Sequence, residues 1–273
     1  MKNIYVCFIS ILCIVLSSCA APADKDESAR AVLDYDKSTI STPIMEYSMS
    51  YQDMIIRENV VELLKAQCFA RHGAVYPRLE GQSGIGETSR DYGVWNVEYT
   101  KKYGLHAPST LSQDSFDRGV MESCLPEVKT ELDKIGGAID RKKLDYPEKL
   151  RFQAYHSATQ DNIWKEYREK WWSCMKDHGL SPRTDDNAWG SAEGDAAYQQ
   201  RGGSQNPASE EEIRVLTIEA QCNEDTGMAR NLANLEAAYQ MPLIREHQTE
   251  LNDLKEQIKA RTEKFQRFIA ENQ

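Results

Sequence analysis

Two segments of the chain repeat one pattern, in which a cysteine is followed by three residues, a histidine and a glycine. The first segment runs from Cys68 to Gly73 and the second from Cys174 to Gly179. A third, from Cys222 to Gly227, keeps the cysteine and the glycine but has threonine in the place of histidine. Recurrence of one pattern indicates an internal repeat, so the local structure around one cysteine should recur around the others.

The residues before the first two patterns have the period of amphipathic helices. Apolar side chains recur at intervals of three and four residues up to each cysteine: Val61, Leu64 and Cys68 in the first segment, and Trp164, Tyr167, Trp171 and Cys174 in the second. Each cysteine is therefore predicted to lie on the helix face that turns toward the core. Gly73 and Gly179 should end these helices in the left-handed conformation that glycine adopts without strain.

A third helix is predicted from about Met121 to Ile135, ending at Gly136. Pro126 lies within this stretch and marks either a first helical turn or a kink, because proline lacks the amide hydrogen of an interior helical position.

The C-terminal region is predicted to be helical from Ser209, which forms a capping box with Glu212. A nearly heptad stripe of apolar residues runs from Leu243 to Ile269 and predicts a long terminal helix. Such a helix either projects as a partner-binding arm or packs back on its own domain.

The N-terminus has the parts of a bacterial secretion signal. Lys2 precedes an apolar run from Ile4 to Leu16, which is shorter than the about 20 residues that a membrane span requires. Leu16-Ser-Ser-Cys19 resembles the lipobox of bacterial lipoprotein signal peptides. The resemblance implies that residues 1–18 are cleaved and that Cys19 is lipidated. We expect residues 19–45 to form the lipidated cysteine and a flexible tether.

The cysteines beyond this leader are Cys68, Cys124, Cys174 and Cys222. In an oxidising compartment disulfides are the default, and four cysteines allow three pairings. If each repeat unit is a helix, a long loop and a helix, the simplest pairing joins Cys68 to Cys124 and Cys174 to Cys222.

The fold class is therefore expected to be mainly α. We predict a disulfide-stapled helical domain of two related helix-loop-helix units, residues 46–140 and residues 141–273, of which the second carries the long C-terminal helix.

Two long, weakly patterned stretches, residues 74–111 and 181–208, separate the predicted helices. They carry Trp95, Tyr99 and Trp189, which are the candidate ligand-binding residues. Aromatic side chains on loops can stack on sugars, and they can also fill a core.

Several segments match a known pattern jointly rather than singly. They are Cys68-x4-Gly73, Tyr92-Gly93-Val94-Trp95, Trp171-x2-Cys174-Met175-x3-Gly179, Ala220-Gln221-Cys222-Asn223-x2-Thr226-Gly227-Met228 and Glu236-Ala-Ala-Tyr239-Gln240. Their order resembles a group of uncharacterised secreted lipoproteins that are common in actinobacteria. The resemblance covers about residues 50–260 and implies an anchored, helical, disulfide-containing envelope protein, without implying a reaction.

Signatures of catalysis were sought and not found: the chain has no His-Glu-x-x-His, Gly-x-Ser-x-Gly or Walker A segment. No cofactor or metal is predicted. The alternative to disulfides is a Cys2His2 zinc site, in which Cys68 with His72 and Cys174 with His178 would each offer two ligands from one helical face.

The charge balance excludes one class of partner. The net charge of −10 argues against nucleic-acid binding. We expect a non-catalytic protein-interaction module on the extracytoplasmic face of the cell membrane. Its expected partners are the membrane, through the lipid anchor, and an envelope protein or wall component. The alternative is a ligand- or glycan-binding module, or an enzyme, that uses the aromatic loops around Trp95 and Trp189.

The lipid anchor gives a first testable prediction, because acylation requires the thiol of Cys19. Cys19→Ala should abolish incorporation of a palmitate analogue in metabolic labelling of a bacterial host, whereas Cys13→Ala, in the same leader, should label like the wild type. Equal labelling of the Cys19→Ala protein would contradict the lipoprotein interpretation.

Overall fold

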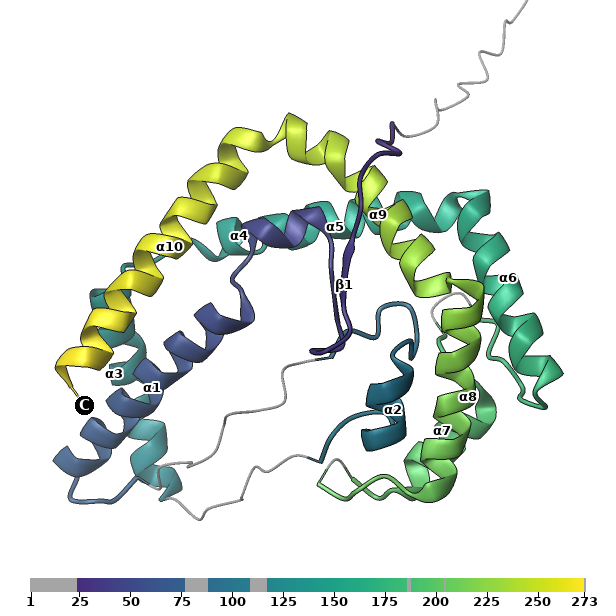
Figure 1. The fold of residues 1–273 in the computed structure, drawn as a ribbon. Coiled ribbons are helices and arrows are strands. Elements are labelled where there is room, and N and C mark those ends of the chain that lie inside the picture. Colours follow the sequence, from purple (N-terminus) through teal and green to yellow (C-terminus); the bar gives the residue numbers. More distant parts are fainter. Residues whose placement is uncertain (1–23, 77–87, 109–116, 186–187, 204, 273) are drawn as a thin grey trace, which may run out of the picture.

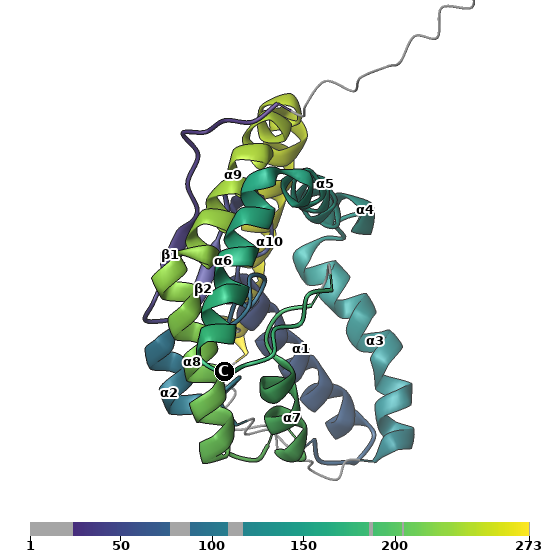
Figure 2. The ribbon, with the colours of Figure 1, turned by 90° about the vertical axis from the view of Figure 1, so that its right-hand side faces the viewer.

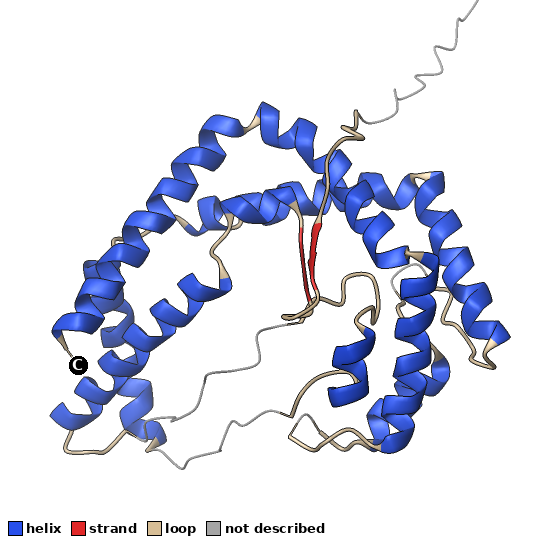
Figure 3. Ribbon diagram, viewed as in Figure 1, coloured by secondary structure: helices blue, strands red, loops and turns tan. Residues whose placement is uncertain are grey.

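The computed structural model describes residues 24–76, 88–108, 117–185, 188–203 and 205–272. The described part of the chain is mainly helical, as the periodicity predicts (Figure 3). Cys19 and the predicted signal peptide lie outside the described residues.

The helices follow one another closely along the chain. They are α1 (Tyr51–Arg71), α2 (Val97–Tyr103), α3 (Arg118–Gly136), α4 (Arg141–Leu144), α5 (Tyr146–Gln160), α6 (Asn162–Asp177), α7 (Ala192–Gln200), α8 (Glu210–Thr226), α9 (Met228–Glu246) and α10 (Gln248–Glu271). Before them come an antiparallel hairpin, β1 (Val32–Asp34) with β2 (Thr39–Ser41), and a 3-10 helix, η1 (Pro43–Tyr47).

These elements form an arch (Figure 1). On one side α1, α3 and α10 pack together, and on the other side α8 packs with α2, α6 and α7. The helix α9 joins the two sides at the top, where it contacts α5, α6 and η1. The two predicted repeat units therefore share cores, because α10 of the second packs with α1 and α3 of the first.

Both cysteine-bearing helices end as the sequence predicts. The helix α1 ends at Arg71 and α6 at Asp177. Gly73 and Gly179 follow with φ angles of 69° and 77°. Nothing lies within 4 Å of a Cβ built on either glycine, so it is the backbone conformation and not crowding that favours glycine there.

The disulfides have the predicted pairing. Cys68 of α1 is joined to Cys124 of α3, and Cys174 of α6 is joined to Cys222 of α8. Each bridge therefore links two helices that are separated in sequence by a long irregular stretch. Pro126 lies inside α3 rather than in its first turn, because that helix already begins at Arg118, after the N-cap Asp117.

The C-terminal helix packs back on the domain. Phe265 of α10 is buried against the core formed by Val60, Leu64 and Leu132. A Cβ on Gly136 would lie 2.6 Å from the Phe265 ring, so glycine at this position admits the aromatic side chain. The predicted apolar stripe is also divided, because α9 ends at Glu246 and α10 begins at Gln248.

The flexible tether expected up to residue 45 is wrong for its described part. Residues 24–47 run along α9, as Figures 1 and 2 show. Ile40 and Ile44 are 2% and 1% exposed. The segment has too few apolar residues for a helical period, and yet these two isoleucines anchor it in the core.

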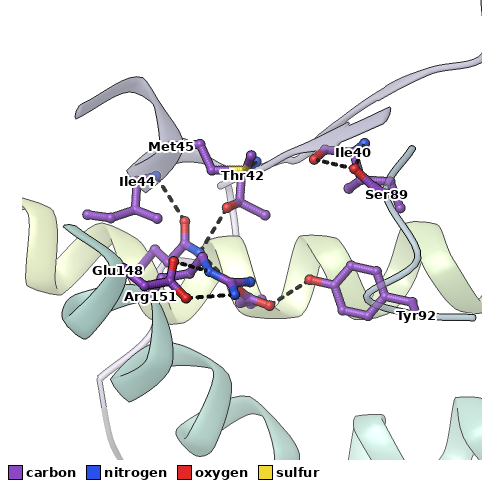
Figure 4. Close-up of polar contacts among 10 residues, drawn as sticks. Ile40, Thr42, Ile44, Met45, Ser89, Tyr92, Glu148 and Arg151 are labelled. Atoms are coloured by element: carbon purple, nitrogen blue, oxygen red, sulfur yellow. Dashed lines mark hydrogen bonds and ion pairs between the residues drawn. The ribbon is translucent and has the colours of Figure 1, made fainter. Parts of the chain in front are cut away.

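The backbone of this segment is also held by α9 (Figure 4). The Ile44 amide donates to Gln240 Oε1 at 3.0 Å, and Gln240 Nε2 donates to Thr42 Oγ1 at 3.0 Å. Both partners are buried, so these hydrogen bonds replace contacts with water that the groups lose on folding. Gln240 thus fixes the entry to η1.

The disulfides give a second prediction. The bridges span 56 and 48 residues of sequence, so the chain-entropy argument assigns them nearly equal effects of about 2–4 kcal/mol each. Cys68→Ala with Cys124→Ala, and separately Cys174→Ala with Cys222→Ala, should lower the urea unfolding free energy by amounts in this range that agree within about 1 kcal/mol. Peptide mapping without reductant provides the control for pairing. Recovery of a Cys68–Cys174 peptide would contradict the structure.

Candidate functional site

Three glutamates on α8 and α9 are buried, and they organise the irregular part of the fold. Glu212, Glu219 and Glu236 are each 0–1% exposed. Their burial is not predictable from the sequence pattern, because glutamate on a helix is normally a surface residue. A carboxyl group without water must find donors in the protein or become protonated. The partners of the three glutamates differ in an informative way.

Glu236 is fully partnered. The hydroxyl of Tyr92 donates to its Oε2 at 2.6 Å, and Gln240 Nε2 donates to its Oε1 at 2.9 Å. Burial raises the pKa of Glu236, and burial together with the Glu236 charge raises the pKa of Tyr92. Figure 4 shows Thr42 above this stretch of α9 and Tyr92 to its right, both directed toward the same group of side chains. This cluster joins the N-terminal segment and the loop before α2 to α9.

Glu212 holds the loop after α2. Its Oε1 accepts hydrogen bonds from the Leu105 amide at 3.0 Å and from Arg201 Nη1 at 3.2 Å. The side chains of Arg201 and Glu212 are both fully buried, so each charge neutralises the other. Ser209 caps α8 as predicted, since its hydroxyl accepts from the Glu212 amide. The Glu212 carboxylate bonds instead to Arg201 and Leu105 and does not complete the predicted capping box.

Glu219 has donors on one oxygen only, and the same holds for Glu212, whose Oε2 is buried without a donor among the described residues. Glu219 Oε1 accepts from the amide of Ser191 at 2.9 Å and from the Ser191 hydroxyl at 2.5 Å. Among the described residues no donor reaches Oε2. Burial raises the pKa of Glu219 from the ordinary 4.5 to about 7, the Ser191 hydrogen bonds oppose this rise, and the charges of Asp195 and Glu193 add to it.

A cavity of about 360 Å³ lies beside this carboxyl group. Its lining comes from the loops before and after α2, from the segment around α7, and from α8: Arg90, Gly93, Val94, Leu105, Trp189, Gly190, Gly194, Asp195, Tyr198, Leu216 and Glu219. The lining combines four apolar side chains and three glycines with Tyr198 and three charged side chains, so it offers apolar contact together with a few polar groups, as small-molecule sites do.

Glycines keep the space around the carboxyl group open. A Cβ on Gly194 would lie 2.4 Å from Glu219 Oε1, and one on Gly190 would lie 3.1 Å from Glu219 Oε2. Gly190 also has a φ of 108°, which side-chain-bearing residues rarely adopt. The backbone therefore approaches Glu219 closely on this side of the cavity.

The loop on the opposite wall is fixed by α8 and α6. Asn223 Nδ2 donates to the carbonyl oxygens of Tyr92 and Val94, at 2.8 and 3.1 Å. Gly93 between them has a φ of 76°, and its Cβ position would lie 3.1 Å from Trp171 Cη2. These residues belong to the segments that carry the family resemblance, and in this structure they shape the cavity wall.

The structure separates the three aromatic residues predicted to bind a ligand. Trp189 lines the cavity, but Trp95 is 3% exposed and donates from Nε1 to the Ser89 carbonyl at 2.8 Å. Tyr99 is half-buried, and its hydroxyl accepts from the Ala107 amide. Trp95 and Tyr99 line only a recess of about 10 Å³, which has room for about one water. Trp95 and Tyr99 therefore serve as packing residues, and the structure does not bring them together with Trp189 at one cavity.

Trp189 is itself held among other side chains. Its ring centroid lies 6.0 Å from that of Trp164 and 6.3 Å from that of Tyr92. The Arg168 guanidinium lies over the ring, 4.9 Å from its centroid, and donates to the Ala188 carbonyl at 3.0 Å. With one face covered by Arg168, Trp189 does not offer the open platform that stacking on an extended glycan requires.

The cysteine and histidine pairs do not form the Cys2His2 arrangement considered from the sequence. His72 lies with Cys68 and Cys124, and His178 lies with Cys174 and Cys222. In each group the potential ligand atoms lie within 4.8 Å of one another. The sulfur atoms are joined in disulfides here, and zinc binding requires thiolates.

Comparison with protein-family models, curated proteins and solved structures gave no match. The expected relation to secreted lipoproteins therefore rests on the quoted segments alone. Among the described residues, no helix has both the length and the hydropathy needed to cross a bilayer.

Glu219 gives a third prediction. Because its folded-state pKa of about 7 lies above the ordinary 4.5, the folded protein binds more protons between these values and loses stability as the pH rises. Between pH 5 and pH 8 the unfolding free energy of the wild type should fall by about 2–3 kcal/mol more than that of Glu219→Gln, measured in urea. Glutamine keeps an acceptor for Ser191 but does not titrate. Glu224→Gln, an exposed change on the same helix, should follow the wild type, and identical pH profiles for all three proteins would refute the assignment.

Proposed function

We propose that the protein is a lipid-anchored, extracytoplasmic binding protein whose helical domain captures a small molecule in the cavity beside Glu219. The observation that carries this proposal is the cavity of about 360 Å³ lined by the buried Glu219, whose Oε2 has no donor among the described residues. Buried polar groups normally have partners, so an unpartnered one beside an open space favours a bound ligand.

The composition of the lining favours binding over catalysis. The described residues around the cavity include an arginine and two acids but no serine, cysteine or histidine. The described lining thus has no serine, cysteine or histidine nucleophile beside a base, and Ser191, whose hydroxyl donates to Glu219, is fully buried. The cavity instead combines apolar walls with few polar groups.

Two observations support the proposed location. The Leu16-Ser-Ser-Cys19 segment has the form of a lipidation site, and two disulfides staple the helices as is usual in oxidising compartments. The protein-interaction function expected from the sequence loses one argument, because α10 packs on α1 and α3 instead of projecting. A small-molecule function needs no projecting arm.

Binding can be tested with a panel of amines, amino acids, carboxylic acids and neutral sugars, observed by saturation-transfer NMR and by thermal unfolding. A ligand at 100 times its Kd should stabilise the folded protein by about 2.7 kcal/mol. At least one chemical class should bind the wild type saturably. If no class binds, the proposed function is wrong.

Variants that fill the cavity locate the binding. Val94→Trp and Leu216→Trp place an indole into the space, because both residues line it and are buried. Ile163→Trp is the matched control, since Ile163 is 36% exposed and lies outside the lining. Circular dichroism should verify that each variant folds. Binding should disappear in the two filled variants and persist in the control, and binding that survives in both filled variants would place the ligand elsewhere.

A further inference from the structure

We propose that this cavity recognises the ammonium group of a small amine, with Glu219 Oε2 as the acceptor and counter-ion. The inference rests on the proposed function, and it adds the chemical class of the ligand. It is carried by three features of the lining: the free acceptor, the local charge and the shape of the apolar walls.

The hydrogen bonds of Glu219 favour a ligand that donates. In the part of the chain that the structure describes, both hydrogen bonds to its carboxyl group end on Oε1, and both come from Ser191. Oε2 lies on the side of Gly190, whose missing side chain leaves the approach open. An ionised carboxylate only accepts, so the group that completes it must be an amine, an ammonium or a hydroxyl.

The surrounding charges favour a cation among these donors. Asp195 also lines the cavity, and Glu193 lies near enough for its charge to act on Glu219. Arg183 is not part of the cavity lining, and its guanidinium is paired with Asp195. An ammonium ion would be attracted by the acidic groups and would form a charge-assisted hydrogen bond, whereas a carboxylate or phosphate at Oε2 would be repelled.

Arg90 is the cationic member of the lining. Its side chain is exposed, and none of its described contacts is an ion pair. Arg90 therefore contributes positive charge at the solvent side, while the buried end carries Glu219. This arrangement admits either a simple amine or a zwitterion whose carboxylate lies toward Arg90.

The other lining residues indicate the size and polarity of the rest of the ligand. Val94, Leu105 and Leu216 are apolar, and Trp189 adds an aromatic edge. A volume of about 360 Å³ is at the lower end of the range for small-molecule sites, about 300–1,000 Å³. The ligand is thus a compact amine with a hydrocarbon or aromatic body.

Protonation couples this binding to pH. The ligand requires ionised Glu219, whose pKa in the empty protein is about 7. Amine affinity should therefore rise about tenfold per pH unit below 7 and level off above it, with a proton released on binding in acid.

The test uses four probes of one shape: phenethylamine, 2-phenylethanol, phenylacetate and phenylalanine, titrated into the folded domain by isothermal calorimetry at pH 6 and pH 8. Phenethylamine should bind at least tenfold more tightly than the alcohol at pH 8, and about tenfold more tightly at pH 8 than at pH 6. Phenylacetate should not bind. If phenylalanine binds as tightly as phenethylamine or more tightly, the ligand is a zwitterion. If phenylalanine binds more weakly, the ligand is a simple amine.

Two variants assign the effect to one residue. Glu219→Gln should remove both the preference for the amine over the alcohol and the pH dependence, while its circular dichroism and disulfide pairing stay those of the wild type. Glu224→Gln, exposed on the same helix, should change neither by more than about twofold. If Glu219→Gln does not fold, Gly194→Ala provides the second variant, because its Cβ would displace the Glu219 carboxyl group and should weaken amine binding at least tenfold.

The inference is overturned if the alcohol or the acid binds as tightly as the amine, if amine affinity is independent of pH, or if no amine binds. Binding of another class from the wider panel would then leave the proposed small-molecule function standing. If no class in that panel binds, both the amine inference and the proposed small-molecule function are wrong.

Discussion

The irregular half of this protein depends on hydrogen bonds that buried glutamates of α8 and α9 make to distant parts of the chain. Glu212 accepts from the Leu105 amide, Glu219 from Ser191, and Glu236 from Tyr92. Each bond connects a regular helix to a stretch that has no repeating backbone pattern of its own. A carboxyl group in an apolar interior strongly disfavours arrangements that leave it without donors, so these three residues select one path for the loops.

The sequence was most informative where structure follows from periodicity. The apolar spacing before Cys68 and Cys174 predicts α1 and α6, and the repeated cysteine and glycine predict the helix ends and the disulfide pairing. These features are local or follow from the repeat, so they need no knowledge of how the chain folds back. The same reasoning could not decide whether α10 projects, because an apolar stripe looks alike against a partner and against α1.

The site was largely invisible to the sequence for a physical reason. Glu219 follows an isoleucine in a helix that begins with three glutamates, so the sequence pattern around it is that of an exposed acidic residue. Its burial depends on the return of residues 189–194, which no local pattern encodes. Trp95 and Trp189 looked equivalent as aromatic residues on long loops, but one fills a core and the other borders a cavity. A possible signal was the cluster of glycines near Trp189, which indicates close approach of the backbone to another group.

The contacts of the N-terminal segment with α9 and with the start of α6 would set how far a lipid-anchored domain could stand from a membrane. Lys25 is paired with Asp161 at 3.1 Å, and the Asp26 amide donates to the Ala238 carbonyl at 2.9 Å. If Cys19 carries lipid, five residues separate it from Lys25, and the six residue-to-residue steps between them reach about 20 Å at full extension. The domain would then lie close to the lipid headgroups, with the side of the arch that carries α9 toward them.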